Sequence, residues 1–349
     1  MLRAYLEDLE SRISPAVEEE LLADWRAFLD GRFSGGIFTP GRRVKAPSRL
    51  EWPRVWVNDA LDDFEQMVLQ QLRGCSDLLA NGAGNLLCVR ANYGTAIIPS
   101  LFGAEIFRMA RHLDTLPTSI PLGGDEATVR RLIAAGVPGL HRSLAGQTLD
   151  TGRRYVSLFR DYPNTARYVR IYHPDYQGPM DICELLWGSS LFLDVLDRPA
   201  LVHQFLGLIT DTYAAMMREW QRIVPFSDDG TEAHWGFLHR GHITLRDDSA
   251  MNFSPAMFEE FIEPYDSRLL REFGGGVVHF CGRGTHYIHR AGAMPGVTGI
   301  AMSQPELNDM ETIWRHTVDR GLDMLGVPHA AAEQALAAGR NLRGRVHCW

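Results

Sequence analysis

Short apolar runs alternate along the chain with longer segments in which apolar residues recur every three or four positions. The short runs predict strands, and the longer periodic segments predict helices. Predicted strands cover residues 86–92, 168–173, 241–248, 276–281, 297–303 and 344–348. Predicted helices cover residues 14–30, 59–73, 124–135, 180–196, 198–222, 254–272, 307–325 and 328–338. Strands that alternate with helices are typical of an α/β fold with a parallel sheet.

Two of the predicted strands have one polar and one apolar face. The polar faces carry Cys88, Arg90 and Asn92 in the first strand, and His242, Thr244, Arg246 and Asp248 in the third. Helices around a barrel rest on apolar side chains, so the polar faces are expected to point inward and to line a pocket at the C-terminal ends. We therefore predict an α/β fold, a (β/α)8 TIM-type barrel with an N-terminal helical and loop extension, from 349 residues and six identified strands.

The N-terminal segment is expected to stand apart from the barrel. In the helix at 14–30, Ser14 is suited to the N-cap and Pro15 to the first turn. The following residues, 31–53, are rich in Gly, Pro and Arg and predict a loop or arm. Its basic cluster at 42–45 is expected to be solvated, although the arm could instead cover a neighbouring site or the second subunit of a homodimer. We assign residues 1–53 to a helix and arm, and 54–349 to the catalytic barrel.

Composition narrows the classes of partner. The net charge is -8 and no basic stripe is present, which argues against nucleic acid binding. No run approaches the roughly 20 apolar residues of a membrane span, and the acidic N-terminal residues do not resemble a signal peptide. We expect a cytoplasmic protein that acts on a small molecule. Its five cysteines are few and widely spaced, which predicts free thiols rather than a disulfide framework.

The sequence His279-Phe280-Cys281 ends a predicted buried strand. Because side chains alternate along a strand, His279 and Cys281 point the same way and can hold one metal ion. Imidazole and thiolate ligands together suit zinc best. Cys348, at the end of another predicted strand, is the candidate third ligand, and three ligands with an open fourth position are typical of catalytic zinc. The alternative is that these residues only pack in the core.

Other polar residues fall at predicted strand ends. Asp248 is a candidate general acid or base, or a hydrogen-bond acceptor for substrate, whereas Asp247 is better suited to a turn or cap. Tyr172 and His173 end the strand at 168–173 and are expected to line the pocket.

A group of histidines lies just before and at the start of the strand at 241–248. His234, His239 and His242 invite a metal hypothesis, but their spacing fits no single face of a helix or strand. We interpret them as loop residues near the pocket mouth.

Several longer motifs give the chain a family resemblance. They are Gln177-Gly-Pro-Met-Asp-Ile-Cys-Glu-Leu-Leu-Trp-Gly188, Asp197-Arg-Pro-Ala-Leu-Val202, Asp247-Asp248 followed by residues 254–261 and Pro264, and His279-Phe-Cys-Gly282. With these motifs, residues 86–310 resemble the uroporphyrinogen decarboxylase superfamily. That (β/α)8 family includes the decarboxylase and zinc-dependent methyltransferases, which move methyl groups between corrinoid proteins and thiols.

The methyltransferase branch is the better match. Its metal motif is His-x-Cys with a distant Cys, which His279, Cys281 and Cys348 match in this sequence. The decarboxylase branch has an arginine-rich segment near its N-terminus that binds many carboxylates, and here Arg90 is the nearest equivalent. The resemblance therefore implies a zinc site that activates a thiol and a methyl donor that is a corrinoid on a partner protein or a small methylated compound.

The resemblance also assigns roles around that site. Asp248, Arg90 and Tyr93 are expected to shape the catalytic pocket, and Asn92, Tyr172, His173 and His242 to contact the bound cofactor or substrate. Two alternatives stay open. One is a metal-independent decarboxylase, in which Asp248 would stabilise a protonated ring nitrogen and Arg90 a carboxylate. The other is a non-catalytic barrel that binds a ligand.

Overall fold

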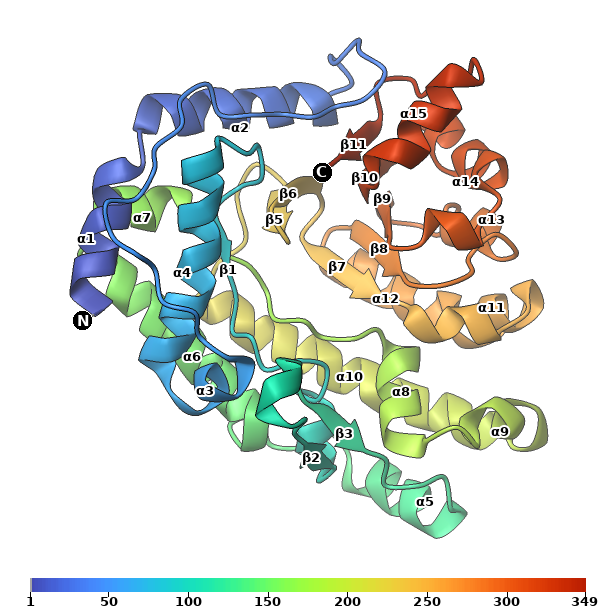
Figure 1. The fold of residues 1–349 in the computed structure, drawn as a ribbon. Helices are drawn as coiled ribbons and strands as arrows, with labels where there is room; N and C mark the ends of the chain where they lie inside the picture. Colours follow the sequence, from blue (N-terminus) through green and yellow to red (C-terminus); the bar gives the residue numbers. More distant parts are fainter. Residues whose placement is uncertain (1) are drawn as a thin grey trace.

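Parallel strands form the centre of the protein, in two separate groups. The computed structural model describes residues 2–349. A five-stranded parallel sheet has the order β11-β10-β9-β8-β7 (Figure 1). Its strands are β7 (Ile243–Arg246), β8 (Gly276–Phe280), β9 (Val297–Met302), β10 (Asp323–Val327) and β11 (Val346–Cys348). A second parallel pair consists of β1 (Cys88–Val89) and β4 (Arg170–Ile171). The α/β class with a parallel sheet is thus confirmed.

A closed eight-stranded barrel is not shown. Within residues 2–349 no backbone ladder joins β4 to β7. In its place, the backbone N–H of Thr244 donates to the imidazole Nε2 of His173 at 3.0 Å. The buried His173 side chain therefore occupies a position where a closed barrel would have a backbone acceptor.

The N-terminal arm extends the other edge of the sheet. Phe38 forms a parallel bridge with His347 of β11. The Phe38 N–H donates to the Val346 carbonyl at 2.8 Å, and the Cys348 N–H donates to the Phe38 carbonyl at 3.1 Å. Phe38 is buried in the same hydrophobic core as the strands. The arm is thereby hydrogen-bonded to the sheet of its own chain.

The prediction of a solvated basic cluster in this arm is wrong for Arg42. Its guanidinium is buried and paired with the buried carboxylate of Glu18 at 2.6 Å, and it also donates to the carbonyl oxygen of Asn85 at 2.9 Å. A buried guanidinium needs such partners because an unpaired charge in the core is costly. The other two basic residues of the cluster, Arg43 and Lys45, are exposed, and Arg43 pairs with Glu20.

Helices surround the strands. The described helices are α1 (Leu2–Arg12), α2 (Pro15–Leu29), α3 (Val57–Asp62), α4 (Phe64–Asn81), α5 (Glu126–Ala135), α6 (Ser143–Phe159), α7 (Pro163–Tyr168), α8 (Pro179–Trp187), α9 (Leu191–Asp197), α10 (Pro199–Ile223), α11 (Pro255–Phe261), α12 (Glu263–Glu272), α13 (Ile288–Ala291), α14 (Met310–His316) and α15 (His329–Ala337). In Figure 1, α11 to α15 lie around the β7–β11 sheet, and α10 runs beneath both groups of strands. Among the helices between residues 2 and 349, none has the length and apolar character needed to span a membrane.

Most predicted elements are present, with shorter bounds. The predicted helix at 180–196 is divided into α8 and α9 because Gly188 adopts a positive φ of 86° that ends α8. The predicted helix at 307–325 is wrong in its second half, where β10 follows α14. A five-residue apolar strand can continue a helical pattern by chance, so periodicity alone did not separate the two.

An antiparallel hairpin was missed entirely. It consists of β5 (Thr231–His234) and β6 (Phe237–Arg240). Trp235 and Gly236 form its turn with φ angles of 48° and 92°. Two successive positive φ angles are typical of the tight turn that matches the twist of paired strands. His234 and His239, which we interpreted as loop residues, are buried strand residues.

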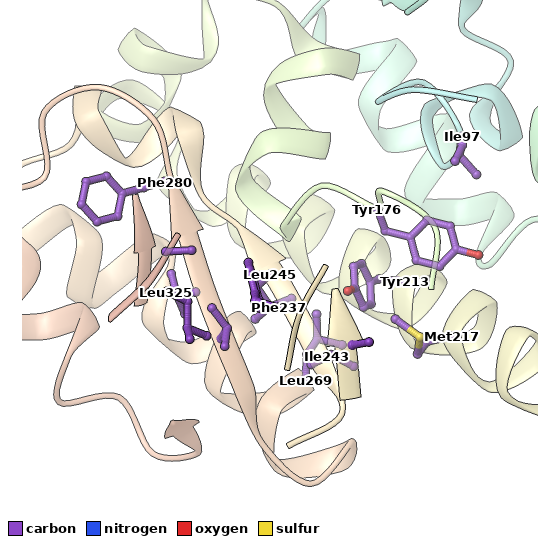
Figure 2. Close-up of a cluster of buried hydrophobic side chains, with 14 of the residues drawn as sticks. Ile97, Tyr176, Tyr213, Met217, Phe237, Ile243, Leu245, Leu269, Phe280 and Leu325 are labelled. Atoms are coloured by element: carbon purple, nitrogen blue, oxygen red, sulfur yellow. The ribbon is translucent and has the colours of Figure 1, made fainter. Parts of the chain in front are cut away.

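The hairpin packs inside the curve of the sheet. At its base, the Thr298 hydroxyl at the start of β9 donates to the Arg240 carbonyl at 2.6 Å. Figure 2 shows Phe237 of the hairpin in one buried cluster with Leu245 of β7 and Leu325 of β10. Because the base lies at the beginning of β9, the tip with Trp235 points toward the C-terminal ends of the strands. A smaller hairpin, β2 (Glu105–Phe107) with β3 (Thr118–Ile120), lies apart from this centre.

Candidate functional site

Three potential metal ligands meet at the C-terminal ends of β7 and β8. Ligand atoms of Asp248, His279 and Cys281 all lie within 4.8 Å of one another. The Cys281 Sγ is 3.4 Å from the His279 Nε2, which is 3.9 Å from the Asp248 Oδ1. The two strands are parallel neighbours, with Arg246 in register with His279, so their ends coincide. Neighbouring strand ends therefore bring Asp248 beside the His-x-Cys pair.

Backbone hydrogen bonds hold Asp248 in place. Its Oδ1 accepts the N–H of Cys281 at 2.7 Å. The buried carboxyl of Asp181, near the start of α8, accepts the N–H groups of Asp248 and Ser249 at 2.9 and 2.8 Å. Asp181 belongs to the motif at 177–188 that carries the resemblance, but the sequence alone indicates no role for it. Its role in the site depends on a contact between α8 and the end of β7. The spacing of residues along the sequence does not predict this contact.

Burial sets the protonation of the two soft ligands. The pKa of His279 is lowered to about 4 by burial, with Asp248 opposing this shift and Arg246 adding to it. The ring is therefore neutral at pH 7, which is the form that binds metals. The pKa of the Cys281 thiol is raised to about 11, chiefly by burial. A nearby cation would be needed to hold Cys281 as a thiolate.

The spacing of these atoms fits a tetrahedral zinc ion. Zinc bonds of about 2.0–2.3 Å to nitrogen, oxygen and sulfur place neighbouring ligand atoms roughly 3.3–3.8 Å apart. The 3.4 Å and 3.9 Å separations of the cluster are close to this range. Asp248 is 42% exposed, so one side of the cluster is open to solvent. Three ligands with an open side fit catalytic rather than structural zinc.

The structure does not bring Cys348, the predicted third ligand, to this cluster. Cys348 lies on β11, which is separated from β8 by β10 and β9. Its buried thiol is close enough to Glu333 of α15 for that carboxylate to act on it, although burial is the main cause that raises its pKa to about 12. Along the described chain, Asp248 takes the third place that the sequence pattern gave to Cys348.

A buried ion group lies next to the cluster. Arg90 and Arg246 both pair with the carboxylate of Asp175. Burial acts to raise the pKa of Asp175, but the two guanidinium groups outweigh it and the pKa is lowered. The Arg246 guanidinium also contacts the Nε2 of His234 at 3.0 Å, and burial keeps the pKa of His234 well below its usual value. Two cations therefore share one carboxylate, and the group is net positive.

Trp235 connects this ion group with the metal-ligand cluster. The Arg246 guanidinium lies 4.6 Å from the centre of the Trp235 ring, a cation–π arrangement. The ring of His279 meets the same indole edge-on at 4.8 Å. Tyr172 packs against His234 at 4.6 Å, on the Arg90 side. The sequence did not indicate Asp175 because it lies beyond the end of the predicted strand at 168–173, nor Trp235 because its hairpin was not predicted.

His173 and His242 are not placed as predicted for cofactor contacts. Since the His173 Nε2 accepts from Thr244, its Nδ1 carries the proton and donates to the Pro174 carbonyl at 2.9 Å. Both ring nitrogens are thus used within the protein. His242 precedes β7 at the end opposite Asp248, where it stacks on Phe226 at 4.6 Å. His242 and Asp248 were predicted on the same face of one strand. They lie at opposite ends of β7, because one face runs along the whole strand.

Tyr93 and Asn92 also lie away from the cluster. The Tyr93 hydroxyl contacts the Thr151 hydroxyl of α6 at 3.0 Å. The Asn92 amide donates to Gln70 of α4 at 3.3 Å. Both follow the end of β1, where the chain turns outward to the helices. Of the predicted site residues, Asp248, His279 and Cys281 form the cluster, and Arg90 and Tyr172 lie beside it.

Comparisons with known proteins bear on the fold. No family model matches the chain. In sequence, the chain is 30% identical over 115 residues to an uncharacterized PPE family protein, PPE59, of Mycobacterium tuberculosis, in two strains. That match covers 31% of this chain and spans 64% of the length of those curated relatives.

Among solved structures, a methyltransferase from Methanosarcina mazei is similar over 84% of this chain and 81% of its own, with a TM-score of 0.60 and 14% identity. At this identity, the likeness shows a shared fold. It leaves the chemistry to be argued from the site.

Proposed function

We propose that the protein is a zinc-dependent methyltransferase of the uroporphyrinogen decarboxylase superfamily. It would move a methyl group between a corrinoid on a partner protein, or a small methylated donor, and a thiol-type acceptor. The observation that carries this proposal is the open cluster of Asp248, His279 and Cys281 at the strand ends. The methyltransferase-like fold is consistent with it.

His279, Cys281 and Asp248 would hold the zinc ion. When bound, zinc lowers the pKa of a thiol ligand and so supplies a reactive thiolate at neutral pH. The protein residues prepare this site. Burial keeps His279 neutral with a free lone pair, and the hydrogen bond from Cys281 N–H keeps Asp248 within reach.

Asp248 is also suited to take up the proton of an incoming thiol. Its side chain is 42% exposed, whereas that of His279 is 12% exposed. As the sulfur–carbon bond forms, the bond between the methyl group and its donor breaks, and the thiol proton remains on a carboxylate or leaves to solvent. The buried Arg246 is in register with His279 on the neighbouring strand, and its positive charge would favour an anion that develops beside that ring.

Two alternatives are less well supported. A metal-independent decarboxylase requires a free arginine for a substrate carboxylate, but Arg90 pairs with Asp175. A non-catalytic ligand-binding barrel leaves unexplained why three ligand types converge at an open strand end. Both alternatives predict that the purified protein contains no stoichiometric metal.

The metal content of the purified protein tests the proposal. We expect about one zinc per chain, lost in His279→Ala and Cys281→Ala and weakened at least 10-fold in Asp248→Ala. Cys348→Ala is the matched control, because this buried cysteine lies outside the cluster, and we expect it to retain zinc. Absence of bound zinc, even after incubation with zinc under reducing conditions, would contradict the proposal. Zinc loss in Cys348→Ala would restore the ligand set first predicted from the sequence.

A further inference from the structure

A cavity of about 320 Å³ lies directly beside His279. Three aromatic side chains form much of its wall: Trp235, Phe237 and Trp349. His279 and Ser303 are its polar lining residues, and the remainder is aliphatic, glycine or proline. A dry apolar cavity of about 150 Å³ suffices to bind benzene. This cavity therefore has room for one aromatic ring with a small substituent.

The electrostatics of the wall select against charged ligands. No carboxylate or cationic side chain within residues 2–349 lines the cavity, so an ion would lose hydration without gaining a side chain of opposite charge. Arg246 already occupies the cation–π position on Trp235, at 4.6 Å, and belongs to the net positive ion group. A cationic ligand would be repelled by it. An aromatic ring that carries no charge meets neither penalty and can pack edge-to-face against the wall.

The backbone at Trp235 gives independent support. Its φ of 48° lies in the left-handed region, which bulky residues avoid and which Asn or Gly usually occupies at this place in a hairpin turn. Strained residues are concentrated at binding and active sites. Here the strained turn places the indole between Arg246 and His279. A residue chosen only to form the turn would not be tryptophan.

We propose that this cavity binds the uncharged aromatic group of the substrate, so that its heteroatom lies beside His279. The substrate class would be an aryl methyl ether or aryl methyl thioether. This inference rests on the proposed methyl transfer for the role of the methyl group, but ring binding itself needs no metal. The two ideas can therefore fail separately.

Calorimetric titration of the full chain with anisole tests the proposal, before and after removal of metal by a chelator. We expect binding in both states. Phenyltrimethylammonium, which adds a positive charge to the same ring, should bind at least about 10-fold more weakly, since repulsion of 1.4 kcal/mol suffices for that factor. Cyclohexyl methyl ether, of similar size but without aromatic character, should also bind more weakly. Equal binding of the three probes would overturn the proposal.

Two variants keep the test independent of misfolding. Trp235→Asn installs the residue preferred in this turn, so we expect it to fold, and it should weaken anisole binding about 10-fold or more. Ala301→Leu places a larger side chain from β9 in the cavity and should also weaken anisole binding about 10-fold or more. Trp52→Ala is the control, because Trp52 packs against Tyr5 far from this site in the fold. Wild-type anisole affinity in folded Trp235→Asn and Ala301→Leu would refute the assignment.

The outcomes also separate this inference from the proposed function. Anisole binding in a protein that takes up no zinc would support the aromatic cavity and refute zinc-dependent methyl transfer. Zinc bound at His279 and Cys281 without anisole binding would support the zinc site and refute the aromatic cavity.

Discussion

At the scale of single residues, the same residue type serves different purposes according to burial and partners. His279 has one side toward a cavity and the other toward Cys281. His173 uses both ring nitrogens to tie β4 to β7. Both histidines lie near the C-terminal end of a strand, and in both burial lowers the pKa, to about 4 in His279 and about 3 in His173. Only the neighbours distinguish a candidate ligand from a structural cross-link.

A substitution at His173 tests this distinction. His173→Ala leaves the buried N–H of Thr244 without an acceptor, which costs about 1–3 kcal/mol of folding free energy. We expect a matching loss in chemical denaturation, with zinc content per folded chain unchanged. If stability were unchanged while ligand binding was lost, the earlier prediction that His173 contacts a cofactor would be favoured instead.

At the scale of elements, the site depends on close contact between the start of α8 and the end of β7. The Gly178 N–H donates to the Arg246 carbonyl at 2.8 Å, and one turn later Asp181 holds the backbone of Asp248. A Cβ atom at Gly178 would lie 2.5 Å from the Arg246 carbonyl oxygen and 2.6 Å from the Asp247 Oδ1. The absence of a side chain at Gly178 therefore permits this approach.

Gly178→Ala should push α8 away from β7. Overpacking of this kind typically costs about 1–3 kcal/mol, and displacement of Asp181 should also weaken zinc binding because Asp248 is no longer held. The matched control is Gly207→Ala in α10, where a Cβ meets no atom of the described chain within 4 Å. We expect that control to be neutral or more stable, since alanine is the better helix former. Equal effects of both variants on denaturation midpoint and zinc affinity would contradict this account.

At the scale of the whole molecule, buried acids make stability depend on pH. Burial raises the pKa of Glu232 to about 7 and that of Asp323 to about 6. Glu232 is half-buried in β5 of the hairpin, and Asp323 is buried at the start of β10, where it pairs with Arg345. Their raised values mean that the folded protein holds protons that the unfolded chain releases. The stabilisation that these protonated carboxyl groups give the folded state is present at low pH and is lost as the pH rises.

We expect these two groups to lower stability as the pH rises from about 4 toward 7. The slope follows because the folded state binds more protons than the unfolded state in this interval. Glu232→Gln should reduce the difference in denaturation free energy between pH 5 and pH 8. Glu65→Gln, at an exposed position on α4, is the control. An unchanged pH dependence in Glu232→Gln would show that its carboxyl group is not protonated in the folded protein.

The sequence alone determined the alternation of strands and helices, the interior strands β8 and β9, and the shared face of His279 and Cys281. These follow from local rules, because strand period and apolar runs depend only on neighbouring residues. The tertiary structure decided which other residues reach that pair. The order and register of β7 and β8 bring in Asp248, while two intervening strands keep β11 and Cys348 away.

The hairpin and the ion group were likewise decided by tertiary structure. Trp235 reaches His279 only because β5 and β6 fold back inside the sheet, and Asp175 is recognised as a partner only once Arg90 and Arg246 meet. Distances between segments far apart in sequence are set by packing and by the need to pair buried charges. Residue spacing along one strand carries no information about them, and for this reason the ligand pair was predictable while its surroundings were not.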